Sequence, residues 1–281
     1  MTLPSLSAPT TFSLAAVFAW GASDFLGGYA SRRTNAFVLT AIAHFSGMVL
    51  VATLALASHS PFPSRTAIEW ALVAGISGGG ALGIFYRALA TGRMGLTAPV
   101  AAVLGAAIPT AFGMFREGLP QTAQIIGFAL AATGIWLISR TEDDSHPEGI
   151  GMAALAGIGF AGYYLCIKQA GDASAFWLAA ISKVSSFALT GAIVLLGRGA
   201  REIDRRGITF GVSAGWLDII GSVLFIRASQ TGRLDAAVVL SSLYPAVTVL
   251  LARLVLKEHF TRWKALGMVA ALLAVPMIAW R

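Results

Sequence analysis

Long apolar stretches separated by short polar segments run through the whole sequence. A helix needs about 20 mainly apolar residues to cross the hydrocarbon core of a bilayer, and ten stretches reach or approach that length. They cover residues 11–30, 36–57, 66–90, 94–115, 121–139, 148–168, 175–197, 207–230, 233–255 and 261–280. Short connections join antiparallel neighbours in a bundle. The pattern therefore predicts an all-α integral membrane protein with ten transmembrane helices.

The most polar stretch of the chain lies at its centre, between Arg140 and Glu148. A polar segment in this position is typical of a link between two units. We therefore expect a five-helix unit over residues 1–140, a polar link over 141–148 and a second five-helix unit over 149–281.

The two halves of the sequence resemble each other at a nearly constant offset. A shift of 140 residues aligns Phe85–Arg93 with Phe225–Arg233, and six of the nine positions are identical. A shift of 139 aligns Ala36–Ser46 with Ala175–Ser185, with six of eleven identical. Because five is an odd number, a duplicated five-helix unit enters the membrane from the opposite side. The repeat predicts two inverted halves with a binding site between them near mid-membrane, a recurring transporter design.

The composition supports a lipid environment. Hydrophobic residues make up 57% of the 281 and charged residues 12%, whereas soluble domains carry roughly 25% charged residues. The net charge of +7 would be compatible with a nucleic-acid partner. The Lys and Arg residues are scattered over short loops, however, and do not form a basic face, so no nucleic-acid partner is expected. The single cysteine, Cys166, excludes an intramolecular disulfide and a cysteine-based metal cluster. No cofactor and no metal site are expected.

Four titratable residues fall well inside the predicted spans: Asp24, His44, Lys183 and Asp218. An ionised group at the bilayer centre costs roughly 2.5–3.5 kcal/mol on insertion scales, so these groups must face a wet cavity, pair together or be neutral. The 139-residue shift makes His44 and Lys183 equivalent, which favours a shared structural or gating role. The two aspartates have no charged equivalent, and an asymmetric substrate needs a site that breaks the symmetry.

Asp24 and Asp218 are therefore the preferred candidates for binding substrate or protons, with a structural ion pair as the alternative. Aromatic residues inside the spans extend the site, since buried tyrosine hydroxyls need partners away from water; an interfacial aromatic belt is the alternative. The complete candidate substrate-binding set is Trp20, Asp24, His44, Tyr86, Tyr163, Tyr164, Lys183, Asp218 and Tyr244.

Small residues and prolines suggest how the helices pack. Gly75, Gly79 and Gly83 lie four residues apart on one helix face, a spacing that lets a neighbouring helix approach closely. Pro109 and Pro245 fall inside the fourth and ninth spans. We expect both prolines to interrupt their helices, and interrupted helices often line transport sites.

Several short features together resemble the EamA-type family of the drug/metabolite transporter superfamily. They are Trp20-Gly21, Tyr86-Arg87-Ala88-Leu89, Pro109, Glu117 and Glu258. The resemblance implies export or exchange of amino acids, metabolites or drugs through a central cavity, without ATP-hydrolysing domains. The sequence departs from the family at His44, where an Arg is usual, at its equivalent Lys183, and at Asp24. These departures leave the substrate open.

The function expected from these features is a membrane transporter, either an exporter or an exchanger, that works by alternating access. Proton coupling through Asp24 or Asp218 is a hypothesis, because a carboxylate in an apolar cavity can exchange a proton near neutral pH. The expected location is the plasma or inner membrane. The partners are a small-molecule substrate and the lipid bilayer, and the sequence leaves open whether the protein is a monomer or a homodimer.

Two other functions are weighed against the transporter. Gly75-Ile76-Ser77-Gly78 matches a motif of intramembrane serine proteases, with Ser77 as the nucleophile. His44 is the one histidine within a span, and the others, His59, His146 and His259, fall in loops or at span ends, so a general base is lacking. The chain is not expected to be an enzyme. The second alternative is a membrane receptor that transports nothing.

Two indications of sidedness disagree. Eleven Lys and Arg residues fall in odd-numbered loops and five in even-numbered loops and the C-terminus. The positive-inside rule would then place both termini outside the cytoplasm. The family resemblance implies cytoplasmic termini, and we favour that arrangement.

Overall fold

The computed structural model describes residues 7–139, 148–197, 205–258 and 261–278. Every regular element within these residues is an α-helix, which confirms the all-α prediction. The helices are α1 (Ala8–Ser31), α2 (Ala36–Ala57), α3 (Arg65–Thr91), α4 (Met94–Glu117), α5 (Thr122–Ser139), α6 (Ile150–Gln169), α7 (Ala175–Leu196), α8 (Arg205–Thr231), α9 (Leu234–Ser241), α10 (Tyr244–Leu256) and α11 (Arg262–Ile278). The predicted polar link, apart from Glu148, lies outside the described residues, as do His146 and His259.

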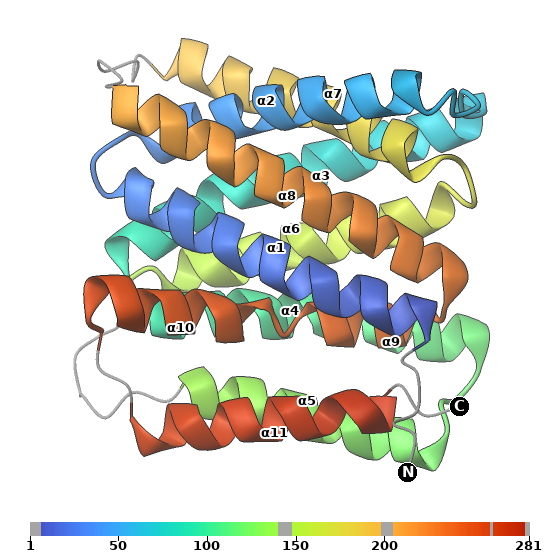
Figure 1. The fold of residues 1–281 in the computed structure, drawn as a ribbon, viewed down its shortest axis with the longest axis vertical. Helices are drawn as coiled ribbons and strands as arrows, with labels where there is room; N and C mark the ends of the chain where they lie inside the picture. Colours follow the sequence, from blue (N-terminus) through green and yellow to red (C-terminus); the bar gives the residue numbers. More distant parts are fainter. Residues whose placement is uncertain (1–6, 140–147, 198–204, 259–260, 279–281) are drawn as a thin grey trace.

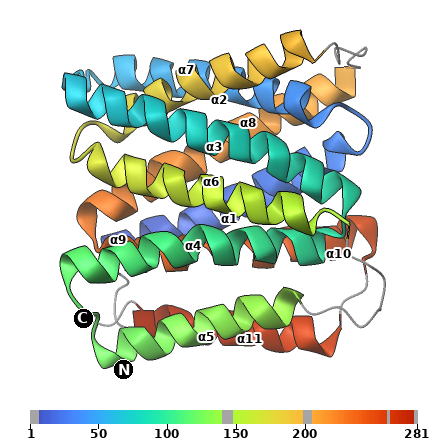
Figure 2. The ribbon, with the colours of Figure 1, turned by 180° about the vertical axis from the view of Figure 1, so that it is seen from behind.

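The helices cross the molecule in alternating directions and stack in layers (Figures 1 and 2). Helices α2 and α7 lie at one end of the long axis, and α5 and α11 pair at the other end (Figure 1). Helices α9 and α10 follow each other along one pass across the bundle, so the eleven described helices make ten passes. The start of α1 and the end of α11 therefore lie on the same side of the bundle (Figure 1).

Most of the helices are long and apolar enough to cross a membrane. Among the described residues, seven helical segments are long and apolar enough to cross a membrane: α2, α3, α4, α6, α7, α8 and the combined α9–α10 segment. Helices α5 and α11 have 18 and 17 residues, or about 25–27 Å at 1.5 Å per residue. Helix α1 carries buried polar residues such as Thr10, Ser13 and Ser23. Helix α1 buries these polar side chains against other helices, so they do not need to face lipid.

The two prolines expected to interrupt helices behave differently. The predicted span over residues 233–255 is divided, because α9 ends at Ser241 and α10 begins at Tyr244 with Pro245 in its first turn. Proline has no backbone N–H, so it cannot continue the hydrogen-bond ladder of the preceding helix. The expectation for Pro109 is wrong, since α4 continues through both Pro99 and Pro109. Neighbouring helices let membrane helices tolerate an internal proline.

The contacts between helices form matching sets. Helix α1 packs on α8 as α6 packs on α3, and α2 packs on α8 as α7 packs on α3. Helix α4 contacts α6, while α9 and α10 contact α1. Helices α2 and α7 pack on each other, as do α5 and α11. The core of the molecule lies where α1, α3, α6 and α8 meet.

The predicted glycine stripe of α3 is confirmed as a surface of close helix contact. A Cβ atom added at Gly75 would overlap the backbone of Ser182 in α7, and one at Gly79 would overlap Ser186 one turn later. Gly83 packs on the ring of Phe37 in α2. The stripe therefore brings the backbone of α3 against α7 and positions the middle of α7 in the core.

Candidate functional site

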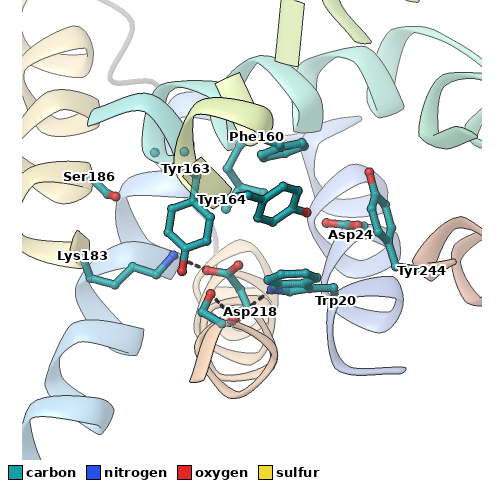
Figure 3. A pocket seen from close by; sticks show the side chains of 13 residues that line it. Trp20, Asp24, Phe160, Tyr163, Tyr164, Lys183, Ser186, Asp218 and Tyr244 are labelled. Atoms are coloured by element: carbon teal, nitrogen blue, oxygen red, sulfur yellow. Dashed lines mark hydrogen bonds and ion pairs between the residues drawn. The ribbon is translucent and has the colours of Figure 1, made fainter. Parts of the chain in front are cut away.

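A cavity lies in the middle of the bundle, between the helices of the first and second halves (Figure 3). Helices α1, α3, α6, α7, α8 and α10 contribute its walls. The lining residues are Trp20, Asp24, Gly78, Gly79, Leu82, Phe160, Tyr163, Tyr164, Lys183, Ser186, Asp218, Ser222 and Tyr244. The space that the centre of a water molecule can occupy is about 50 Å³. A single water needs roughly 10–15 Å³ by this measure, so the cavity accommodates a compact ligand.

Lys183 and Asp218 form a buried ion pair in one wall of the cavity. The Lys183 Nζ donates a hydrogen bond to Asp218 Oδ2 at 2.5 Å, and the two side chains are 7% and 10% exposed. Figure 3 shows both side chains pointing toward each other across the gap between α7 and α8. The pair neutralises two of the charges that the sequence places inside the membrane.

His44 extends this pair away from the cavity. The Lys183 Nζ lies 3.5 Å from His44 Nδ1, and His44 Nε2 lies 3.5 Å from the carbonyl oxygen of Gly79. An ammonium group can only donate, so Nδ1 accepts and the ring proton is on Nε2. The imidazole in this arrangement is neutral and donates to Gly79.

Asp24 differs from Asp218 in having no partner. The residue is 6% exposed, and it makes no hydrogen bond or ion pair with any other residue in the described parts of the chain. Its carboxylate lies among the side chains of Trp20, Tyr164 and Tyr244 (Figure 3). Helical periodicity explains the proximity of Trp20, because residues four apart share a helix face. The cavity thus contains one carboxylate that the protein does not compensate.

The aromatic wall is held in place by the surrounding helices. The Trp20 Nε1 donates a hydrogen bond of 3.2 Å to the backbone oxygen of Asp218, and Gly221 leaves the space that the indole occupies. The ring of Tyr164 lies 6.0 Å from Trp20 and 4.6 Å from Phe225, measured between centroids. These contacts fix the orientation of the rings that face Asp24.

One tyrosine hydroxyl at the cavity has no partner among the described residues. The hydroxyl group of Tyr244 is buried and makes no hydrogen bond to another described residue. Buried polar groups are normally hydrogen-bonded. The Tyr244 hydroxyl is therefore available to a polar atom of a ligand.

The structure brings together most of the residues selected from the sequence. Trp20, Asp24, Tyr163, Tyr164, Lys183, Asp218 and Tyr244 line the cavity. His44 lies behind Lys183. Tyr86 lies behind the wall, where its hydroxyl is 3.0 Å from Ser23 Oγ, which itself donates to the carbonyl of Ala214.

Sequence reasoning missed several lining residues. Ser222 follows Asp218 by one helical turn, Ser186 follows Lys183 by nearly one turn, and Phe160 precedes Tyr164 by one turn. Extending the helical period from the charged and aromatic residues would have found all three. Trp216, a further aromatic residue within a span, is 49% exposed on the outer surface.

Apolar helices of membrane-spanning length around a buried charged cavity define a multi-pass membrane protein. Residues 147–280, the second half of the chain, match the model of the EamA-like transporter family, part of the drug/metabolite transporter superfamily. This match confirms the family resemblance noted in the sequence.

Two further comparisons place the chain among known proteins. It is 33% identical over 76 residues to an uncharacterised protein of Methanocaldococcus jannaschii. That match covers 27% of this chain and 56% of the relative, so the chain spans about half the length of the curated relative it matches. A solved crystal structure resembles the whole fold, with a TM-score of 0.80 at 15% identity over 98% of this chain and 99% of the other.

Proposed function

We propose that the protein is a solute transporter, an exporter or exchanger, that carries small molecules through the central cavity by alternating access. The observation that carries the proposal is the cavity itself, which holds charged side chains in the middle of apolar helices and is lined by both halves of the chain. Charged groups at this depth commonly mark substrate or ion pathways. The family match of the second half supports transport as the activity.

Matching contacts in the two halves support an inverted repeat. Gly75 in α3 packs on the backbone of Ser182 in α7, and Gly215 in α8 packs on the backbone of Ala43 in α2. The shifts of 140 and 139 residues convert one contact into the other. Two halves with the same packing can exchange conformations, which is the structural basis of alternating access.

The contact between His44 and Lys183 supports the same symmetry. These residues are equivalent under the 139-residue shift, and their side chains are 3.5 Å apart. Equivalent residues can contact each other only close to the axis that relates the halves. The cavity, which Lys183 lines, then lies close to that axis.

Asp24 is the better candidate for proton coupling. Asp218 is paired with Lys183, whereas Asp24 faces Tyr164, Tyr244 and the cavity without an ionic partner. An isolated buried carboxylate is unfavourable unless a proton or a cation neutralises it. We propose that proton and substrate compete for Asp24, which would couple outward movement of one to inward movement of the other.

The test is flux in proteoliposomes, with amino acids, metabolites and organic cations offered with and without a pH gradient. We expect the wild type to transport at least one class and to respond to the gradient. Asp24→Asn should remove the response to the gradient, whereas Asp172→Asn, at an exposed loop position, should retain it. Absence of flux for every solute would contradict the transporter proposal and favour a receptor.

The serine protease alternative gains no support. The Ser77 hydroxyl donates a 2.8 Å hydrogen bond to the carbonyl of Gly159. Among the described residues, no histidine, lysine or carboxylate is hydrogen-bonded to Ser77, and a serine nucleophile requires such a base. His44 is already held between Lys183 and Gly79.

A further inference from the structure

We infer that the central cavity binds a compact organic cation, with Asp24 as its counter-ion and the rings of Trp20, Tyr164 and Tyr244 around it. This inference names the substrate class for the transport site and so rests on the proposed function. Binding alone can be measured without transport, which allows the two proposals to be tested separately.

The charges of the lining residues favour a positively charged ligand. The cavity lining contains two carboxylates, Asp24 and Asp218, and a single basic side chain, Lys183. Lys183 is paired with Asp218, and its contact with His44 requires that ring to be neutral. Asp24 therefore remains as the one lining carboxylate without an opposite charge. A buried carboxylate is strongly unfavourable unless a proton or a cation neutralises it, so an occupant with one positive charge can take the place of the proton.

The aromatic rings of the lining also favour a cation. A cation is attracted to the face of a Trp or Tyr ring within about 6 Å of its centroid, and cages of such rings recognise quaternary ammonium groups. Trp20 is fixed by its hydrogen bond to the backbone of Asp218, and Tyr164 packs on it at 6.0 Å. Fixed rings beside an uncompensated carboxylate combine the two features that favour an ammonium group.

The same balance disfavours anions and zwitterions. Lys183 is the one basic residue among the lining residues, and Asp218 already neutralises it. A carboxylate or phosphate on the ligand would find no free positive charge and would be repelled by Asp24. We therefore expect a cation to bind better than an amino acid of similar size.

The size of the cavity limits the ligand. The space open to the centre of a water molecule is about 50 Å³, whereas pockets for drug-sized ligands occupy roughly 300–1,000 Å³. The site in this conformation therefore fits a compact cationic head group. The unpartnered hydroxyl group of Tyr244 is available to a hydroxyl or amine on such a ligand.

The experiment is equilibrium binding to the purified protein in detergent, measured by calorimetry. The cationic probes are tetramethylammonium, guanidinium and choline. Choline has two matched controls: 3,3-dimethylbutan-1-ol, its uncharged isostere, and glycine betaine, which adds a carboxylate. We expect at least one cation to bind, and choline to bind at least tenfold more tightly than either control. Failure of all three cations to bind, or equal binding of choline and its uncharged isostere, would overturn the inference.

Variants locate the binding site. Asp24→Asn should weaken binding of the cation at least tenfold, and Trp20→Leu should weaken it severalfold, whereas Asp172→Asn should leave it unchanged. Thermal unfolding of each variant reports whether it is folded, and the comparison of choline with its controls in the wild type holds even if a variant is not. Unchanged cation binding in a folded Asp24→Asn variant would overturn the inference.

Together, the binding and flux measurements distinguish failure of the cation inference from failure of the transporter proposal. Cation binding that depends on Asp24, without flux of any solute, supports the inference and contradicts the transporter proposal. Flux of amino acids or neutral metabolites without cation binding supports the transporter proposal and overturns the inference.

Discussion

At the scale of single residues, the central feature is how four intramembrane charges are arranged. Lys183 contacts both Asp218 and His44, and Asp24 has no ionic partner among the described residues. The sequence predicted that these groups would pair, face a cavity or be neutral, because bare charges are unfavourable in lipid. All three outcomes occur. The sequence could not predict which group took which role, since the choice depends on how α1, α2, α7 and α8 pack on one another.

The ion pair gives a prediction about stability. Lys183→Met leaves the Asp218 carboxylate buried without an ionic partner, and Asp218→Asn leaves the Lys183 ammonium group buried without an opposite charge, with His44 as its remaining contact. Each change should destabilise the protein by about 3–5 kcal/mol, as expected when one member of a buried pair is removed. The double variant should be more stable than the sum of the single effects predicts. Thermal unfolding in detergent measures this, and additive effects would show that the pair does not couple.

At the scale of helices, the sequence predicted the number of passes, and the structure adds their interruptions. Pro245 coincides with the break between α9 and α10, while Pro109 lies in a continuous helix. The break is supported from outside α10, because Gly21 in α1 packs on the backbone of Tyr244 and accepts a hydrogen bond from the Thr248 hydroxyl. Such contacts between distant segments cannot be read from a local pattern. They bring Tyr244 into the cavity.

The close contacts of glycine give a prediction for the helices. Gly75→Ala and Gly215→Ala each place a methyl group against the backbone of a facing helix and should lower the thermal stability. Gly191 in α7 has no atom within 4 Å of an added Cβ. Gly191→Ala should stabilise slightly, by about 0.5–1 kcal/mol, since Ala is the better helix former. Equal effects at Gly75 and Gly191 would show that the close contact of α3 with α7 is unimportant.

At the scale of the whole molecule, the proposed duplication links the sequence to the proposed mechanism. The offsets of 139 and 140 residues found in the sequence recur as matched contacts, Gly75 with Ser182 and Gly215 with Ala43. Where the repeat is broken, at Asp24 and Asp218, both residues line the cavity. The cavity is also lined by Phe160, Ser186 and Ser222. Neither the charged residues nor the repeat identified these three in the sequence, because their place in the wall depends on how the halves pack.

Alternating access predicts that the cavity opens to each side of the membrane in turn. The chain has one cysteine, Cys166, so Cys166→Ser gives a background for a single cysteine in place of Ser222 in the cavity wall. A membrane-impermeant maleimide should label this cysteine both in right-side-out and in inverted vesicles. A cysteine in place of the exposed loop residue Asp172 should be labelled from one side only. Labelling at position 222 from a single side, with flux absent, would contradict the transport mechanism.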